Sequence, residues 1–318
     1  MVKQLLLTTI CSIALSCGAT TLDFDKITHW TGEGDARAAL VVLFDGQKTA
    51  QVWGFRWDKS AADKPSGADM VKAIANASTD FDVMIQWTNF GYTFSGAGYS
   101  FDHTVMNWLR YDFEGAVDDA NISFNYYTPN TGMGQTGAPG AAAQEICDQA
   151  IEEAKTTHVI EHPLSHREYG YSAYDYDHWQ LDEGAPKNIL WRAGWYNGYW
   201  SYWVGDTKLD EMGYSGLGMS SVRLEDGAVN GWAYYNFQDD DYGSTDIDWN
   251  VELDYEHLSV NAIQDLQSVV TSPAQDAAAT VYTLSGVCLG RYADRRDNLP
   301  AGIYIVHTSS GAAYKVRL

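Results

Sequence analysis

Apolar and polar positions along the chain form several short strand-like segments and two helical ones. Residues 38–44 are continuously apolar, as in a strand that is buried on both faces. Residues 49–57 follow with three aromatic residues on one face, namely Trp53, Phe55 and Trp57. The chain is therefore expected to begin its folded part with two adjacent strands.

A helix and a third strand are predicted next. The Ser66 hydroxyl can accept a main-chain amide of the first helical turn, while the Asp69 carboxylate reaches back, which is the pattern of a capping box. Apolar side chains then recur at helical spacing, at Met70, Ala73, Ile74 and Ala77. Alternation over residues 81–87 predicts a strand, residues 141–155 predict a second helix, and residues 228–237 predict a late strand.

Residues 191–203 contain four tryptophans and three tyrosines around Asn197-Gly198. Asn-Gly between two strand-like runs is a strong signal for a two-residue hairpin. Such a hairpin pairs Trp195 with Trp200 and Arg192 with Trp203. One of its faces then carries Trp191, Trp195, Trp200 and Tyr202, and the other carries Arg192, Tyr196, Tyr199 and Trp203.

A hairpin rich in aromatic residues on both faces suggests that one face packs inward and that the opposite face meets a partner or ligand. Tyr92 and Tyr99, in a glycine-rich aromatic segment at 89–101, are expected to supply a second wall. The alternative is that the rest of the chain covers both faces of the hairpin.

Composition restricts the class of partner. The chain has 318 residues, 45% of them hydrophobic, a formal net charge of -22 and a pI of about 4.5. A polyanion repels nucleic acids and anionic membrane surfaces, and no apolar segment is long enough for a transmembrane span. Of the four cysteines, Cys147 and Cys288 are far apart, so no disulfide framework is expected.

The N-terminus resembles an export signal. Lys3 precedes a short apolar stretch at 5–15 and small residues at 16–19, which predicts a signal peptide over residues 1–19. Cys17 leaves lipoprotein processing open as an alternative. Either route predicts an exported protein.

Candidate chemistry is sparse. Three histidines are spaced four apart, but Pro163 interrupts the helix that would align them. These residues could form a transition-metal site or be ordinary loop residues, and an acidic loop at 239–248 could hold Ca²⁺ or simply be solvated. The histidines and their acidic neighbours are His158, His162, His166, Asp175, Asp177 and His178. Because no nucleophile elbow, zinc-protease motif or phosphate loop is present, we expect a protein without enzymatic activity.

Three segments together resemble the transcobalamin-like C-terminal domain family. They are SGADMVKAI (66–74), GYWSYWVGD (198–206) and LEDGAVNGWAYYNF (224–237). The resemblance implies an α+β fold with a β-grasp-like sheet, one packed helix and a long insertion at about 101–188. It implies cobalamin as a possible ligand, with one of the histidines named above as a possible ligand of its cobalt. Because Trp200 and Tyr202 match the aromatic strand of the family, it also implies that their face packs on the helix at 67–77 and that the opposite face meets the ligand.

The C-terminal segment is similar to the sorting domain of type IX secretion. The similarity lies in VYTLSG (281–286), LPAGIYIV (299–306) and YKVRL (314–318). It implies a small all-β module at 280–318, joined by a linker at 268–279 to a ligand-binding domain at 20–267. It also implies the type IX machinery as a partner and display at the cell surface or release.

The sequence as a whole thus predicts a secreted or surface-displayed binding protein. A corrinoid such as cobalamin is the leading ligand, and glycan binding or a structural, adhesive role are the alternatives. The expected ligand-binding residues are Arg192, Tyr196, Tyr199, Trp203, Tyr92 and Tyr99.

Overall fold

The computed structural model describes residues 20–45, 47–120, 125–127, 134–136, 142–165, 174–237, 247–257, 279–283, 288–300, 303–307 and 313–317. The predicted signal peptide, His166, Asp239 to Asp241, Asp246 and nearly all of the predicted linker lie outside these residues.

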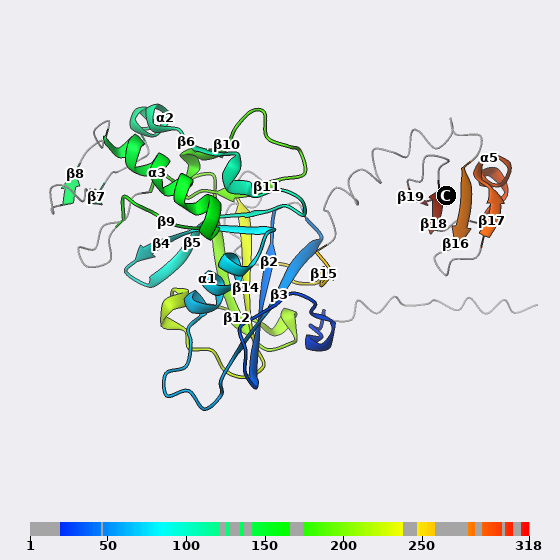
Figure 1. Ribbon diagram of the computed structural model, residues 1–318, viewed down its shortest axis with the longest axis horizontal. Helices are drawn as coiled ribbons and strands as arrows, with labels where there is room; N and C mark the ends of the chain where they lie inside the picture. Colours follow the sequence, from blue (N-terminus) through cyan, green and yellow to red (C-terminus); the bar gives the residue numbers. More distant parts are fainter. Residues whose placement is uncertain are drawn as a thin grey trace, which may run out of the picture.

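Two large sheets form the centre of the main body, and two further sheets, β10-β6 and β7-β8, have two strands each (Figure 1). A seven-stranded sheet has the order β1-β3-β2-β14-β12-β13, with β15 also paired to β3, and a four-stranded sheet has the order β11-β5-β4-β9. The first contains β1 (Trp30–Thr31), β2 (Ala36–Leu43), β3 (Thr49–Trp57), β12 (Gly198–Gly205), β13 (Gly213–Tyr214), β14 (Ala228–Asn236) and β15 (Glu252–Asp254). The second contains β4 (Phe81–Thr88), β5 (Gly91–Tyr99), β9 (Val159–Glu161) and β11 (Leu190–Ala193).

Both sheets are mixed. β14 runs parallel to β2 and antiparallel to β12, and β9 runs parallel to β4, whereas β4 and β5 form an antiparallel pair. The predicted order of strand, strand, helix, strand is confirmed by β2, β3, α1 (Gly67–Ala77) and β4, so the α+β class is confirmed as well.

The main core lies between the two sheets and includes one face of α1. The capping box of α1 is present as predicted, since Ser66 accepts from the Asp69 amide while Asp69 binds the Ser66 amide. Met70 and Ile74 are buried from the helix, as the spacing predicted, and Trp53 and Phe81 meet in a tilted ring contact. Burial of these apolar faces is the main force that holds the two sheets together.

The described residues of segment 101–188 cover the outer face of the four-stranded sheet with a second core. The long helix of this segment, which the sequence predicted at 141–155, buries Ala143, Cys147, Ile151 and Ala154. The elements of this segment are η2 (Val105–Asn107), β6 (Leu109–Tyr111), α2 (Phe113–Asp118), β7 (Asn125–Tyr127), β8 (Gly134–Thr136), α3 (Ala142–Thr157), η3 (Tyr176–His178) and β10 (Trp179–Leu181).

The outer face of the seven-stranded sheet carries a third core, which includes η1 (Phe24–Lys26) and η4 (Leu209–Glu211). One more short helical turn, η5 (Met219–Ser221), precedes β14. Within the described part of the chain, every helix falls short of the length and apolar character needed to cross a bilayer.

The described C-terminal residues form a separate antiparallel sheet with its own apolar cluster. Its order is β17-β16-β18-β19, and it does not share a strand with the other described sheets. Its elements are β16 (Thr280–Thr283), β17 (Cys288–Arg291), α5 (Tyr292–Arg295), η8 (Arg296–Asn298), β18 (Ile303–His307) and β19 (Ala313–Arg317). Its role as a sorting domain stays a prediction.

The predicted aromatic hairpin is wrong. β11 pairs with β5 and β12 pairs with β14, so the chain passes from one sheet to the other at Gly194 to Asn197 instead of turning back on itself. Glycines explain the choice of partner for β11. A Cβ at Gly96 of β5 would lie only 2.7 Å from the Trp191 ring, so the large side chain fits over a strand surface that lacks side chains.

Candidate functional site

A cleft of about 500 Å³ opens between the two sheets, near the end of β4 and the beginning of β5. Its walls come from both sheets and from the segment that joins β13 to η5. The lining residues are Thr88, Asn89, Phe90, Thr93, Phe94, Tyr174, Gly194, Trp195, Tyr199, Trp200, Tyr202, Tyr214, Ser215, Gly216, Leu217, Gly218 and Trp232.

Stacked aromatic rings form the inner part of this cleft. Phe94 of β5 lies flat on Trp232 of β14, with ring centroids 4.1 Å apart and planes within 3°. Trp232 in turn stacks on Tyr202 at 4.5 Å, and Trp200 meets the edge of Phe94 at 5.7 Å. Because Phe94 and Trp232 belong to different sheets, this stack joins the sheets and gives the cleft a rigid base.

Exposed apolar side chains lie on the rim of the cleft. Phe90 is 66% exposed, Trp195 46%, Tyr214 55% and Leu217 53%. Scattered exposed apolar residues need no explanation, but four that line one concave surface indicate an interaction site. The rim is also held together by the backbone, since the Gly218 amide donates to the Phe90 carbonyl at 2.7 Å.

Asp177 fixes the segment that carries Trp195. Its carboxylate accepts hydrogen bonds from the amides of Trp195, Tyr196 and Asn197 at 2.8, 2.9 and 3.0 Å. Three amides converging on one carboxylate hold a tight backbone turn, and hydrogen bonds to a charged acceptor are the stronger kind. The Trp195 ring is further supported by Tyr174, at a centroid distance of 5.1 Å.

The lining is uncharged. Among its described residues, tyrosine is the only type that can ionise, although the chain carries a net charge of -22. Burial raises the pKa of Tyr199 to about 12 and raises the pKa of Tyr202 further, so both hydroxyls are neutral at pH 7. The described lining residues therefore include no side chain suited to general acid or base catalysis near neutral pH.

The six residues predicted to bind a ligand do not form one surface. Tyr199 lines the cleft, and Tyr196 contributes its amide to the turn held by Asp177. Tyr99 is fully buried in the core between the sheets, and Tyr92 hydrogen-bonds Glu161 at 3.0 Å. Only Tyr199 of these four is therefore part of the cleft wall.

The predicted pairing of Arg192 with Trp203 is also wrong, because the two residues lie in different sheets. Arg192 forms an ion pair with Asp45. Trp203 lies opposite Gly231 and packs in the third core, where it meets Trp249 edge-on at a centroid distance of 6.2 Å. The two side chains therefore take part in two unrelated interactions.

The predicted inward face is confirmed in part. Trp200 and Tyr202 are buried in the core that includes α1, whereas Trp191 is buried in the second core and Trp195 is exposed on the cleft rim. The segment 89–101 was expected to supply a wall, and it does so through Phe90 and Phe94 instead of Tyr92 and Tyr99. Pattern analysis did not identify Tyr174 or Tyr214, because each enters the cleft from a segment that the sequence does not link to the others.

The histidines and aspartates considered for a metal site are used as separate pairs. His158 binds Asp82 at 3.0 Å, and His178 binds Asp119 at 3.2 Å. His162 binds Asp175 at 2.7 Å in a fully buried pair. Asp177 is occupied by the three amides, and Asp248 accepts from the Asn250 amide at 2.9 Å.

Asp175 belongs to a small buried network. Burial alone would raise the pKa of its carboxyl group, but His162 and the Tyr111 hydroxyl, which donates at 2.7 Å, lower the pKa overall. The network lies inside the second core, so it holds β6 and η3 in place and is closed to a ligand.

Comparisons with models of protein families, with curated proteins and with solved structures found no match to this chain.

Proposed function

We propose that this chain is a non-enzymatic binding protein and that its cleft takes the ring face of an uncharged ligand. The observation that carries the proposal is the lining itself. Its described residues are rich in aromatic side chains from two sheets, and tyrosine is the only ionisable type among them. Aromatic walls favour flat or weakly polar ring faces, and the lack of a charged group in the lining favours a neutral partner.

A neutral glycan fits this cleft best. A volume of about 500 Å³ lies within the range of pockets that surround a small organic ligand. The apolar face of a sugar ring can stack on Trp195, and the side-chain amide of Asn89 lies in the lining, where it can bind hydroxyl groups of the sugar. Such a site combines apolar area with a few polar groups that fix orientation.

A corrinoid is the second candidate. The strands that carry the resemblance to the transcobalamin-like family, β12 and β14, supply Trp200, Tyr202 and Trp232 to the cleft. We propose, as part of the same resemblance, that these strands and α1 form a β-grasp-like fold. Because a corrinoid is larger than the ligands such a pocket encloses, the cleft would hold one edge of the corrin ring.

The test uses the purified chain and two sets of probes. Neutral oligosaccharides are titrated with tryptophan fluorescence as the signal, and cyanocobalamin is tested by co-elution of its red absorbance in gel filtration. We expect saturable binding to one of the two. If neither class binds, the proposed function is wrong.

A pair of tryptophan variants locates the site. Trp195→Ala removes an exposed ring on the cleft rim, so it should weaken binding at least tenfold while leaving the fold intact. Trp203→Ala is the matched control, because Trp203 belongs to the third core, on the outer face of the sheet. Equal affinities of the wild type and Trp195→Ala would contradict this location.

Export and surface display form a separate part of the proposal, supported by the residue patterns at 1–19 and 280–318. Deletion of residues 280–318 should leave the main body folded and retained in the periplasm. Normal surface display of the truncated chain would refute it.

A further inference from the structure

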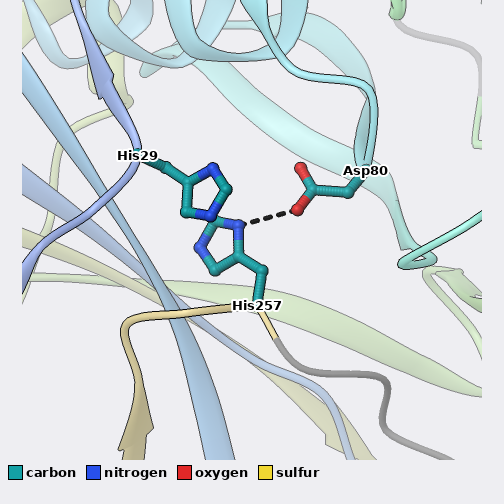
Figure 2. A group of neighbouring side chains, drawn as sticks. All are labelled: His29, Asp80 and His257. Atoms are coloured by element: carbon teal, nitrogen blue, oxygen red, sulfur yellow. Dashed lines mark hydrogen bonds and ion pairs between the residues drawn. The ribbon is translucent and has the colours of Figure 1, made fainter.

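Three side chains from distant parts of the sequence meet away from the cleft (Figure 2). His29 precedes β1, Asp80 lies between α1 and β4, and His257 follows β15. Each residue offers one ligand atom, and these atoms all lie within 4.8 Å of one another. They are the only group of this kind among the described residues.

His257 is held in a fixed orientation. One ring nitrogen, Nε2, is 2.8 Å from the Val52 carbonyl oxygen, to which it must donate, and Nδ1 is 2.7 Å from Asp80 Oδ2. The side chain is 1% exposed and lies against Trp53 at a centroid distance of 4.6 Å. A histidine that donates to a backbone carbonyl through one nitrogen presents the other nitrogen to a partner, as metal-bound histidines do.

His257 also has a strained backbone. Its φ is +52°, and among the described residues only one other non-glycine residue, His158, has a positive φ. For a residue with a Cβ this conformation costs free energy, and it is kept only where contacts with the surrounding structure compensate the cost. Here it places the ring in the core beside Asp80.

His29 provides the accessible side of the group. Its ring stacks on that of His257, with centroids 3.8 Å apart and planes within 8°, and the residue is exposed (Figure 2). Because the residue is exposed, a ring nitrogen of His29 can be reached from solvent. An unprotonated imidazole nitrogen is a common ligand of a metal ion.

We propose that His29, Asp80 and His257 bind a transition-metal ion, with Zn²⁺ as the ion that fits best. Two imidazole nitrogens and one carboxylate oxygen are ligands that zinc accepts, and three protein ligands leave a fourth position for water. Ca²⁺ and Mg²⁺ prefer oxygen ligands and fit this set poorly. Asp254 acts on His29 through its charge and adds to the negative potential around the group.

Binding requires two local changes. In a tetrahedral zinc site with bonds of about 2.0–2.1 Å, ligand atoms lie roughly 3.3 Å apart. The ion therefore replaces the proton between His257 and Asp80, and the 2.7 Å contact opens slightly. Because a metal lies in the plane of each imidazole it binds, the exposed His29 ring must turn out of its stack on His257.

The proposed metal site is distinct from the cleft. Asp80 immediately precedes β4, whereas Thr88 at the other end of β4 lines the cleft. A strand of this length separates the two places by about 25 Å at 3.3 Å per residue. The two proposals can therefore fail independently.

The experiment titrates untagged full-length protein, freed of metal by a chelator that is then removed, with ZnCl₂ against a chromophoric zinc indicator. We expect one ion per chain, and release of one proton as the ion replaces the proton held between His257 and Asp80. His29→Ala should weaken binding by about 100-fold or more, which exceeds the effect of losing an outer hydrogen-bond partner. Since His29 is exposed, this variant should fold normally.

The control is His103→Ala. His103 is partly exposed and lies 3.3 Å from Asp102, but it belongs to no three-ligand group among the described residues. This variant should bind zinc as the wild type does. The visible absorption of bound Co²⁺ supplies a second signal. The wild type should show the absorption bands of tetrahedral Co²⁺, and His29→Ala and Asp80→Asn should not. Failure of the wild type to bind one ion, or undiminished binding by His29→Ala, would overturn the proposal.

Discussion

Replacing Asp177 with alanine should destabilise the protein by about 3 kcal/mol. The carboxylate accepts three backbone amides at 2.8–3.0 Å, those of Trp195, Tyr196 and Asn197. A hydrogen bond to a charged group contributes about 1.5–3 kcal/mol when it is well protected. Since Trp195 and Asn197 are exposed, water compensates part of each loss, and about 1 kcal/mol per bond remains.

Urea unfolding measures this loss, with Asp177→Asn as an intermediate variant, because one amide oxygen can replace only part of the carboxylate. Asp206→Ala is the matched control, since Asp206 accepts a single amide, from Lys208, in an exposed turn. The control should stay within about 0.5 kcal/mol of the wild type. Asp177→Ala should also bind the cleft ligand about tenfold more weakly than the wild type, because binding must then order the Trp195 side chain. If Asp177→Ala unfolds like the control, the carboxylate does not hold this turn.

Three further outcomes are expected. Ser66→Ala should lower the free energy of unfolding by about 1 kcal/mol through loss of the α1 cap, as measured by urea denaturation. Trp200→Ala should cost about 3–5 kcal/mol, because this side chain is buried and its indole donates to the Arg192 carbonyl at 2.9 Å; a near-neutral effect would contradict its place in the core. The hydrogen bond with Asp82 raises the pKa of His158, and burial raises the pKa of Asp82, so the folded pair holds its proton more tightly than the unfolded chain does. Unfolding free energy should therefore fall as pH rises above about 6.5 through the raised pKa of His158, and His158→Gln should flatten that dependence.

Local signals predicted the elements well. Residues 49–57 alternate as a strand and form β3 with the same bounds, and Ser66 caps α1 because the capping box depends only on residues three apart. The predicted helix and the strands on either side of it also indicated the α+β class. These features were predictable because their physical causes act over a few neighbouring residues.

Long-range partners were not predictable from such signals. Asn197-Gly198 favours a hairpin locally, yet Asp177 binds the amides before it and Gly96 leaves room for Trp191 on β5. The cleft was difficult to predict for the same reason. Tyr199 was predicted as a ligand contact, but Phe94 reaches the site from another sheet. His29, Asp80 and His257 have no motif spacing, so only the fold brings them together.

The parallel pairing of β2 with β14 has a kinetic consequence. It joins Ala38 to Ala228, so the centre of the seven-stranded sheet cannot close until nearly the whole main body is available. Contacts between residues so far apart in sequence are slow to form, since the loop between them must first lose its conformational freedom. The strand that carries Trp232 thus joins β2 late, and a chain interrupted before β14 lacks the floor of its cleft.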